Sequence, residues 1–450
     1  MFVRYIFCII CIVVLVGCAT TEKTGQQDTD SPFESISSSL LLGDPQKAIN
    51  AYEAAYAEKP DDSVTRVLYA RLLILAGKYT QARNEIESIL TLEPENADAL
   101  YALSLLEGLE GKKEKEKELL EQVTRENNGN PEAMSSLGKI YLEEKKYDQA
   151  KDLFLKVKKE DEKSIVALLG LGNISYREKK YDEAESYFTA AIEADEQYPF
   201  SYIDRARVRK RQGDVAGALQ DLQTAIELDP EYPYSHYDRG RILMDKGERE
   251  QAIADFSKAI ELDPEIFIAY VMRGGLYDEM DNYQRAIEDY EMTLTLKPAY
   301  YFSYSALGTL YLLTGQYEPA SLMYLNAYNH EKDRHEYVLL AALALKWAGK
   351  EKEAFAVLKE KQKLLPRDSW YYPLSNYYMN PQNDFNVVSI ANQEKNAVTK
   401  GRILFYIAAQ YLFQNKEKPA VTYLIETKNI DRNGIIEKRL AGNLLEKYKK

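Results

Sequence analysis

The stretch REQAIADFSKAIELDP (residues 249–264) contains two residues, Ala252 and Pro264, that recur along the chain at a fixed interval. Prolines separated by 34 residues or a multiple of 34 are Pro60, Pro94, Pro230, Pro264, Pro298 and Pro366. Alanines in one shared phase are Ala48, Ala82, Ala150, Ala184, Ala218, Ala252, Ala286, Ala320 and Ala354. Small residues earlier in each interval are Ala70, Gly138, Gly172, Ala206, Gly240, Gly274, Gly308 and Ala342. This regularity indicates an internal repeat.

The repeat units start at residues 29, 63, 97, 131, 165, 199, 233, 267, 301 and 335, so ten in-phase units span residues 29–368. The small residue, the alanine and the proline then stand at repeat positions 8, 20 and 32. Small residues let two helices approach closely, and proline ends a helix because it has no amide hydrogen to donate. Each unit is therefore predicted to be a helix-turn-helix, and the stacked units to form an all-α array.

This pattern resembles the tetratricopeptide repeat, which has a small residue at position 8, alanine at 20, an aromatic residue at 24 and proline at 32. The stretch YDEAESYFTAAIEAD (residues 181–195) is close to the family consensus, and Tyr290 and Tyr324 stand at position 24. The third unit is the weakest match, since Glu116 replaces the alanine. The resemblance implies a right-handed superhelical solenoid of helix-turn-helix repeats.

The carboxyl-terminal part departs from the phase. Residues 369–400 are interpreted as a degenerate unit, residues 401–434 as a returning repeat, and residues 435–450 as a capping helix. The degenerate unit contains an aromatic cluster that is either a second contact surface or local core. Its members are Trp370, Tyr371, Tyr372, Tyr377 and Tyr378.

The amino terminus is interpreted as a targeting signal. Arg4 precedes an apolar run, residues 5–16, that is too short for an ordinary spanning helix. The run ends in Leu-Val-Gly-Cys (residues 15–18), which resembles the lipobox of bacterial lipoproteins. The resemblance implies a signal peptide at residues 1–17 and acylation of Cys18. The polar residues that follow are interpreted as a flexible tether, so that the lipidated cysteine and the tether together span residues 18–32. The alternative is a plain signal anchor, or a cleaved signal with a chance cysteine.

Several classes of function are disfavoured. The formal net charge of -13 opposes nucleic-acid binding, which depends on neutralising phosphates. All three cysteines lie within the first 18 residues, and the three histidines have no metal-ligand spacing, so no metal or other cofactor is expected. No Gly-Lys pair is followed by Ser or Thr, which excludes a Walker phosphate loop. Carboxylates among lysines at helical spacing are typical of solvated faces, so we expect no enzyme.

The groove of the predicted solenoid is the candidate functional site. In tetratricopeptide arrays it is lined by positions 2, 5, 9 and 12 of each first helix. Reading these positions, mainly in the fifth to seventh units, gives the candidate partner-binding residues Asn173, Tyr176, Phe200, Ile203, Arg207, Lys210, Tyr234, Tyr237, Arg241, Met244 and Phe302. The hypothesis is a partner segment with acidic groups or a terminal carboxylate near Arg207 and Arg241, because arginine binds carboxylates through two parallel hydrogen bonds.

Apolar anchors are expected further along the groove, at Leu312, Leu339 and Leu343. The alternative is that Arg207 and Arg241 pair with Asp204 and Asp238 or stay solvated. The arginines at position 7 are expected to be structural; they are Arg205, Arg239 and Arg273. The chaperone-binding branch of the family has a lysine where Leu169 stands, so that function is not expected.

The leading hypothesis is a non-catalytic, lipid-anchored scaffold that binds an envelope protein or a peptide segment in its groove. This resembles the tetratricopeptide lipoproteins of the bacterial envelope. In some bacteria an aspartate after the lipidated cysteine retains lipoproteins in the inner membrane. This chain has Ala19 at that position, so the expected location is the outer membrane, facing the periplasm. The alternative is an accessory component that binds a small molecule for an envelope transporter, which a closed apolar pore around residues 302–343 would favour.

Overall fold

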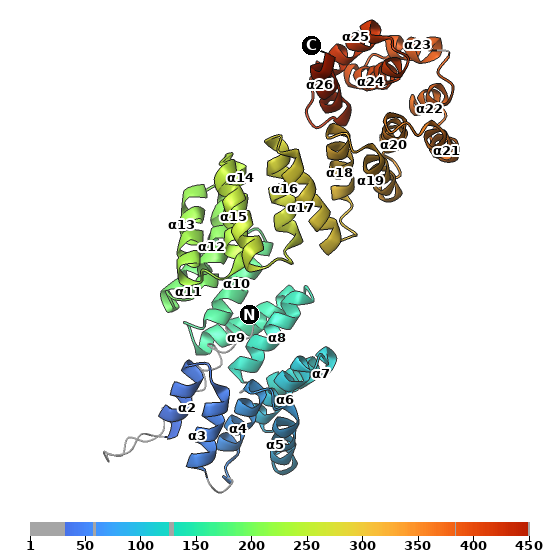
Figure 1. Ribbon diagram of the computed structural model, residues 1–450. Helices are drawn as coiled ribbons and strands as arrows, with labels where there is room; N and C mark the ends of the chain where they lie inside the picture. Colours follow the sequence, from blue (N-terminus) through green and yellow to red (C-terminus); the bar gives the residue numbers. More distant parts are fainter. Residues whose placement is uncertain (1–31, 57–59, 126–129, 383, 449–450) are drawn as a thin grey trace. The chain divides into compact units, whose positions relative to one another are not determined.

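The computed structural model describes residues 32–448 apart from 57–59, 126–129 and 383 (Figure 1). The predicted signal peptide, Cys18 and residues 18–31 of the predicted tether lie outside these described residues. Within them the regular structure is entirely helical, with one short 3-10 turn (Gln362–Leu364) and no strand. The predicted all-α helical repeat fold is therefore confirmed.

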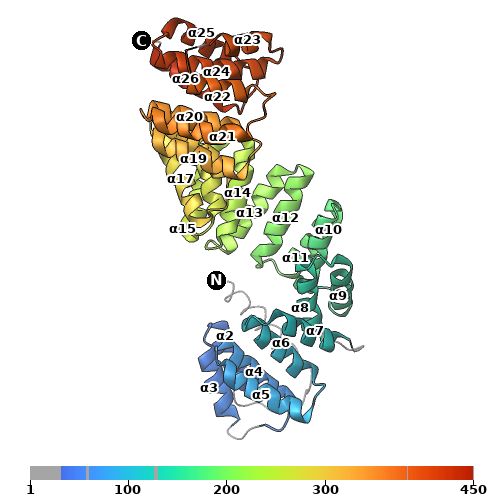
Figure 2. The ribbon, with the colours of Figure 1, turned by 90° about the vertical axis from the view of Figure 1, so that its right-hand side faces the viewer.

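The chain divides into two compact units, one ending at Leu228 and the other beginning at Asp229. Each unit is a series of helical hairpins in which consecutive hairpins pack on one another (Figure 2). The first unit contains α2(Pro32–Leu41), α3(Pro45–Ala55), α4(Ser63–Leu75), α5(Tyr79–Leu92), α6(Ala97–Leu109), α7(Lys113–Thr124), α8(Pro131–Glu143), α9(Tyr147–Glu160), α10(Ile165–Arg177), α11(Tyr181–Ala194), α12(Pro199–Gln212) and α13(Val215–Leu228).

The second unit continues the alternation of first and second helices and then becomes irregular. It contains α14(Pro233–Lys246), α15(Arg249–Leu262), α16(Phe267–Glu279), α17(Tyr283–Leu296), α18(Phe302–Leu313), α19(Tyr317–His330), α20(Glu336–Trp347), α21(Glu351–Lys361), α22(Tyr371–Met379), α23(Phe385–Gln393), α24(Ala397–Phe413), α25(Glu417–Lys428) and α26(Ile436–Tyr448).

Local sequence explains where the helices begin and end. Helices α12 and α14 start at Pro199 and Pro233, where the missing amide hydrogen costs nothing and the fixed φ suits the first turn. Both helices end at a glycine in the left-handed conformation, Gly213 at φ 90° and Gly247 at φ 82°. A residue with a Cβ is strained at such a φ, so glycine sets the turn into each second helix.

Within a hairpin, the small residue at position 8 lies under the aromatic ring at position 24. A Cβ added to Gly172 would lie 2.5 Å from Cε1 of Phe188, which is 1% exposed. The alanine at position 20 is fully buried in the same hairpin, as in the others. These side chains explain the 34-residue pattern, because the two helices of a hairpin can pack this closely only where one of them has a small residue.

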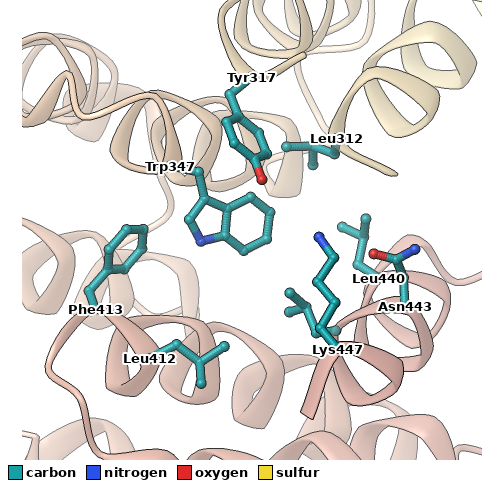
Figure 3. A pocket seen from close by; sticks show the side chains of 9 residues that line it. Leu312, Tyr317, Trp347, Leu412, Phe413, Leu440, Asn443 and Lys447 are labelled. Atoms are coloured by element: carbon teal, nitrogen blue, oxygen red, sulfur yellow. The ribbon is translucent and has the colours of Figure 1, made fainter. Parts of the chain in front are cut away.

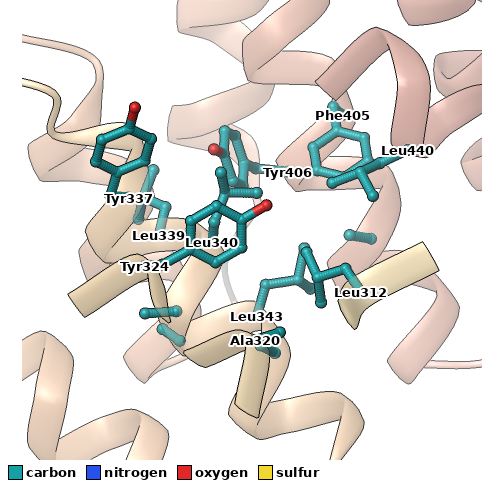
Figure 4. Packing of buried hydrophobic residues seen from close by; sticks show 14 of the residues in the cluster. Leu312, Ala320, Tyr324, Tyr337, Leu339, Leu340, Leu343, Phe405, Tyr406 and Leu440 are labelled. Atoms are coloured by element: carbon teal, nitrogen blue, oxygen red, sulfur yellow. The ribbon is translucent and has the colours of Figure 1, made fainter. Parts of the chain in front are cut away.

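The carboxyl-terminal helices differ from expectation. Helix α24 begins at Ala397, four residues before the predicted start of the returning repeat, because Asn396 caps it by accepting a hydrogen bond from the Thr399 amide. Helix α26 was predicted as a polar end cap, but it also packs against α18. Its Leu440 belongs to the large apolar cluster of the second unit, with Tyr324, Leu343 and Tyr406 (Figure 4).

Candidate functional site

In the first unit, neighbouring first helices bring a set of cations to one face. Helix α10 contacts both α8 and α12, so equivalent positions of the three helices lie near one another. Position 9 carries Lys139, Asn173 and Arg207, and positions 12 and 13 carry further cationic or phenolic groups. We call this set the cationic face and define it as Lys139, Asn173, Tyr176, Arg177, Arg207, Lys210 and Arg211.

Asp204 is the carboxylate at the centre of the cationic face. Its Oδ2 accepts a hydrogen bond from Asn173 Nδ2 at 3.3 Å, and its Oδ1 accepts one from Arg207 Nη1 at 3.0 Å. The side chain of Arg207 nevertheless stays 46% exposed. Exposed ion pairs three residues apart contribute little to stability, so this pair leaves the guanidinium accessible to an incoming carboxylate. The structure thus agrees with the alternative interpretation in which Arg207 pairs with Asp204.

Two other arginines of the face are held by tyrosines. Arg211 Nε donates to the Tyr176 hydroxyl at 3.1 Å, and Arg177 lies over the Tyr147 ring at 5.7 Å from its centroid. In the part of the chain that the structure describes, neither arginine forms an ion pair with a carboxylate. The positive charge of these two groups is therefore not neutralised locally. Glu143, at position 13 of α8, is the acidic exception.

Lys139 was missed by the sequence analysis, which read the groove positions from the fifth unit onward. Its side chain is exposed, and no hydrogen bond or ion pair engages its ammonium group within the described residues. Neighbouring protein atoms displace part of the water around Lys139, and this desolvation lowers its pKa. An exposed ammonium that forms no ion pair within the described residues is accessible to an anion from outside the chain.

The remaining predicted groove residues of the first unit are less accessible. Phe200 is half-buried, with its ring 5.4 Å from that of Tyr198. Ile203 is only 2% exposed. The prediction that Ile203 contacts a partner is therefore wrong, because α12 turns this side chain into the packing between helices.

In the second unit, the predicted residues of α14 lie on one helix face. Arg241 lies over the Tyr237 ring at 5.6 Å and 3.9 Å from Asp238, and 46% of its side chain is exposed. Tyr234 is 41% exposed, and Met244 is half-buried. Burial raises the pKa of the half-buried Tyr237, so its hydroxyl stays protonated. Arg241 and Arg207 belong to different units, so α14 is a separate candidate surface.

Phe302 is also accessible, with 56% exposure, and its ring lies 4.3 Å from that of Tyr301. The apolar anchors predicted further along are not accessible. Leu312, Leu339 and Leu343 are 3%, 0% and 0% exposed. They were expected to line an open groove, but they join the core that includes Tyr406 of α24 and Leu440 of α26 (Figure 4).

The position-7 arginines have the structural role expected of them. Arg205, Arg239 and Arg273 each form two hydrogen bonds with an aspartate 16 residues later, which lies on the second helix of the same hairpin. These aspartates, Asp221, Asp255 and Asp289, are at most 5% exposed. Burial alone would raise the pKa of Asp255, but hydrogen bonds from Arg239 and His236 lower it below its usual value.

The aromatic cluster of the degenerate unit is mostly local core. Tyr377 and Tyr378 are 3% and 2% exposed, and the Tyr378 hydroxyl donates to the Tyr406 carbonyl at 2.9 Å. Trp370 and Tyr371 are half-buried and stack at 3.8 Å between ring centroids. Of the two interpretations left open by the sequence, packing within the unit accounts for these side chains.

The described residues also bear on metal binding and on membrane crossing. No group of three or more His, Cys, Asp or Glu side chains there is arranged to hold a metal ion. None of the helices in that part of the chain has the length and apolarity needed to cross a membrane.

Comparisons with known proteins agree with the repeat architecture. A family model described as the tetratricopeptide repeat protein 21 N-terminal ARM repeat matches residues 45–253, and a tetratricopeptide repeat model matches residues 237–301. No curated protein matches the chain significantly.

Solved structures with partial similarity include one that is described as a TPR protein. The crystal structure of MamA is 24% identical and aligns 37% of this chain with 98% of that chain, at a TM-score of 0.34. YrrB, described as a TPR protein with an unusual peptide-binding site, is 21% identical over 42% and 98% of the two chains, at 0.34. Pseudomonas aeruginosa pilF is 18% identical over 54% and 95%, at 0.38. With TM-scores this low, none of these likenesses supports a conclusion about function. The 34-residue pattern, the phased helix pairs and the two family matches together support tetratricopeptide-type repeats over residues 45–301.

Proposed function

We propose that this protein is a non-catalytic adaptor that holds an acidic segment of a partner protein against the cationic face of its first unit. The observation that carries the proposal is the unneutralised charge of Lys139, Arg177 and Arg211 in a chain whose net charge is -13. Lysine and arginine form charge-assisted hydrogen bonds with carboxylates, and Tyr176 adds contact area at low entropic cost.

We further propose that the adaptor is anchored in the bacterial envelope through Cys18. The support is the lipobox-like Leu-Val-Gly-Cys and the polar residues that follow it. Two or more acyl chains make membrane attachment effectively permanent. Ala19 favours the outer membrane, with the repeats facing the periplasm. An adaptor tethered there would keep its partner close to the membrane surface.

The test is capture of partners from envelope extracts by the full-length protein and by two charge-reversed variants. The face variant carries Lys139→Glu, Arg177→Glu and Arg211→Glu. The matched control carries Lys156→Glu, Lys159→Glu and Lys163→Glu, which change the same charge at exposed positions of α9 and the following loop. We expect the face variant to lose the partner and the control to keep it, with equal helical content by circular dichroism.

Capture should also weaken as salt rises, because exposed charges are screened within about 8 Å at physiological ionic strength. If the face variant captures the same proteins as the wild-type chain while remaining folded, the cationic face is not the binding site. Arg241→Glu tests the separate surface on α14 in the same assay.

A further inference from the structure

The second unit contains a cavity of about 270 Å³ that the proposed adaptor function does not use (Figure 3). It lies between α18, α19 and α20 on one side and α24 and α26 on the other. The apolar part of its wall consists of Leu312, Leu412, Phe413, Leu440 and Leu444. Two aromatic residues with polar atoms, Tyr317 and Trp347, and two polar residues of α26, Asn443 and Lys447, complete the lining.

The polar groups of this lining have no partner of their own. Within the described residues, no hydrogen bond or ion pair engages the side chains of Tyr317, Trp347, Asn443 or Lys447. The ammonium of Lys447 and the hydroxyl of Tyr317 point into the open space in Figure 3. Two polar groups that point into a small, largely apolar cavity, with Asn443 in the lining beside them, are the usual arrangement of a site that fixes the orientation of a ligand.

The cavity is also positive. No lining residue is acidic. A second cation, Lys346, lies behind the wall, with its Nζ 5.7 Å from the centroid of Phe413 and 2.8 Å from the Gln410 side-chain oxygen to which it donates. Burial lowers the pKa of Lys346, and none of its hydrogen bonds is to a carboxylate. Lys447 is an exposed residue of the lining, and an anionic head group would form an ion pair with it, whereas a neutral head group would not.

We propose that this cavity binds a small monocarboxylic acid with an apolar body. The body packs against Leu312, Phe413 and Leu444, and the carboxylate accepts hydrogen bonds from Lys447 and Asn443. An enclosed apolar volume of about 150 Å³ holds one benzene ring, so this cavity suits roughly eight carbon atoms. One ammonium and one amide match the two oxygens of a carboxylate. The site lies wholly in the second unit and is independent of the cationic face.

The test is titration of the full-length protein with octanoate, followed by fluorescence and by isothermal calorimetry. Trp347 is one of two tryptophans in the chain, so its emission reports on the cavity. The variant Trp347→Phe identifies which part of the signal belongs to it. Octan-1-ol and octylamine carry the same apolar body with a neutral and a positive head. We expect saturable 1:1 binding of octanoate, binding of octanol weaker by about tenfold, and none of octylamine.

Two variants separate the carboxylate site from general hydrophobic binding. Lys447→Gln should weaken octanoate binding about tenfold, to the level of octanol, without changing octanol binding. Lys428→Gln, at an exposed position of α25, is the matched control and should bind octanoate like the wild-type chain. Lack of saturation with octanoate, or equal binding by the two variants when circular dichroism shows both folded, would overturn the proposal. Neither result bears on partner capture by the first unit.

Discussion

Arg439 forms a two-pronged ion pair with Asp278, a residue 161 positions earlier in the chain. Its Nη1 lies 2.8 Å from Oδ2 of Asp278, and its Nη2 donates to the other carboxylate oxygen. The guanidinium also lies over the Tyr283 ring, 5.4 Å from the centroid. The pair joins the last described helix, α26, to the carboxyl-terminal turn of α16. It therefore fixes a helix that sequence alone would place at the end of the array.

Replacing Arg439 should loosen α26 while leaving the hairpins intact. The side chains of the pair are 33% and 21% exposed, so Arg439→Ala should destabilise this contact by about 1–3 kcal/mol. We expect faster hydrogen exchange in α26, measured by mass spectrometry. Arg249→Ala is the control, since its pair with Glu279 is 49% and 60% exposed and is worth less than about 1 kcal/mol. Unchanged exchange in α26 would mean that the ion pair does not hold the helix.

Two glycine-to-alanine changes should act in opposite directions. Gly172→Ala should destabilise the protein by about 1–3 kcal/mol, because the new methyl group would overlap the Phe188 ring. Gly442→Ala has nothing within 4 Å of the new Cβ and lies inside α26. It should stabilise the protein by up to about 1 kcal/mol, the usual helix preference for alanine. Urea unfolding followed by circular dichroism measures both; a neutral Gly172→Ala would contradict the packing argument.

The buried carboxylate Glu107 should make stability depend on acid pH. Burial alone would raise the pKa of Glu107, but the hydrogen bond from Arg83 and the ion pairs with Lys115 and Lys112 lower it to about 2. A folded-state pKa below the unfolded one stabilises the protein above about pH 4.5 and ceases to do so as pH falls toward 2. The contribution at neutral pH is on the order of 3 kcal/mol.

The measurement is the urea midpoint between pH 7 and pH 3 for wild-type protein and Glu107→Gln. The variant should be less stable at pH 7, and the difference should shrink as pH falls, because wild-type Glu107 then takes up a proton. Glu87→Gln, at an exposed site on α5, should follow the wild-type curve. A pH-independent gap between Glu107→Gln and wild type would contradict the lowered pKa.

Cys18→Ala should release the protein from membranes. Without the thiol no acyl chain can be attached at this site, and the anchoring free energy of roughly 0.8 kcal/mol per buried methylene is lost. Fractionation with a carbonate wash should move the variant to the supernatant. Cys11→Ala changes a cysteine inside the expected signal peptide and should leave the protein in the membrane fraction. Persistent membrane association of Cys18→Ala would rule out the anchor.

Much of the fold could be predicted from the sequence because its determinants are local. Small residues recur at the repeat positions of Gly172 and Ala184, because the two helices of each hairpin pack closely at the same place. The same logic correctly assigned Arg205 and its counterparts to packing. The position of α26 could not be predicted, because Arg439 meets Asp278 only through long-range packing that no periodicity records.

The candidate site could be predicted only in part. Position numbers place Arg207 and Tyr234 on accessible helix faces, where the structure has them. Position numbers do not show how much of a side chain the neighbouring helices bury. For this reason Ile203, Leu339 and Leu343 were expected at the surface and are buried. Lys139 was overlooked because the groove positions were read only from the fifth unit onward, and a column of residues does not show that its ammonium forms no ion pair within the described residues.

The contact between α26 and α16 has a consequence for how this repeat family could change length. In a simple array each repeat touches only its neighbours, so a whole 34-residue unit can be duplicated or lost at the cost of one interface. In the first unit, Arg71 of the second repeat already pairs with Glu132 of the fourth, and that freedom remains for the repeats that follow Glu132. In the second unit, adding or removing a repeat between Asp278 and α24 would carry Arg439 out of reach of its partner. Evolutionary growth and repeat engineering should therefore be tolerated between Glu132 and Leu228 and resisted beyond Asp278.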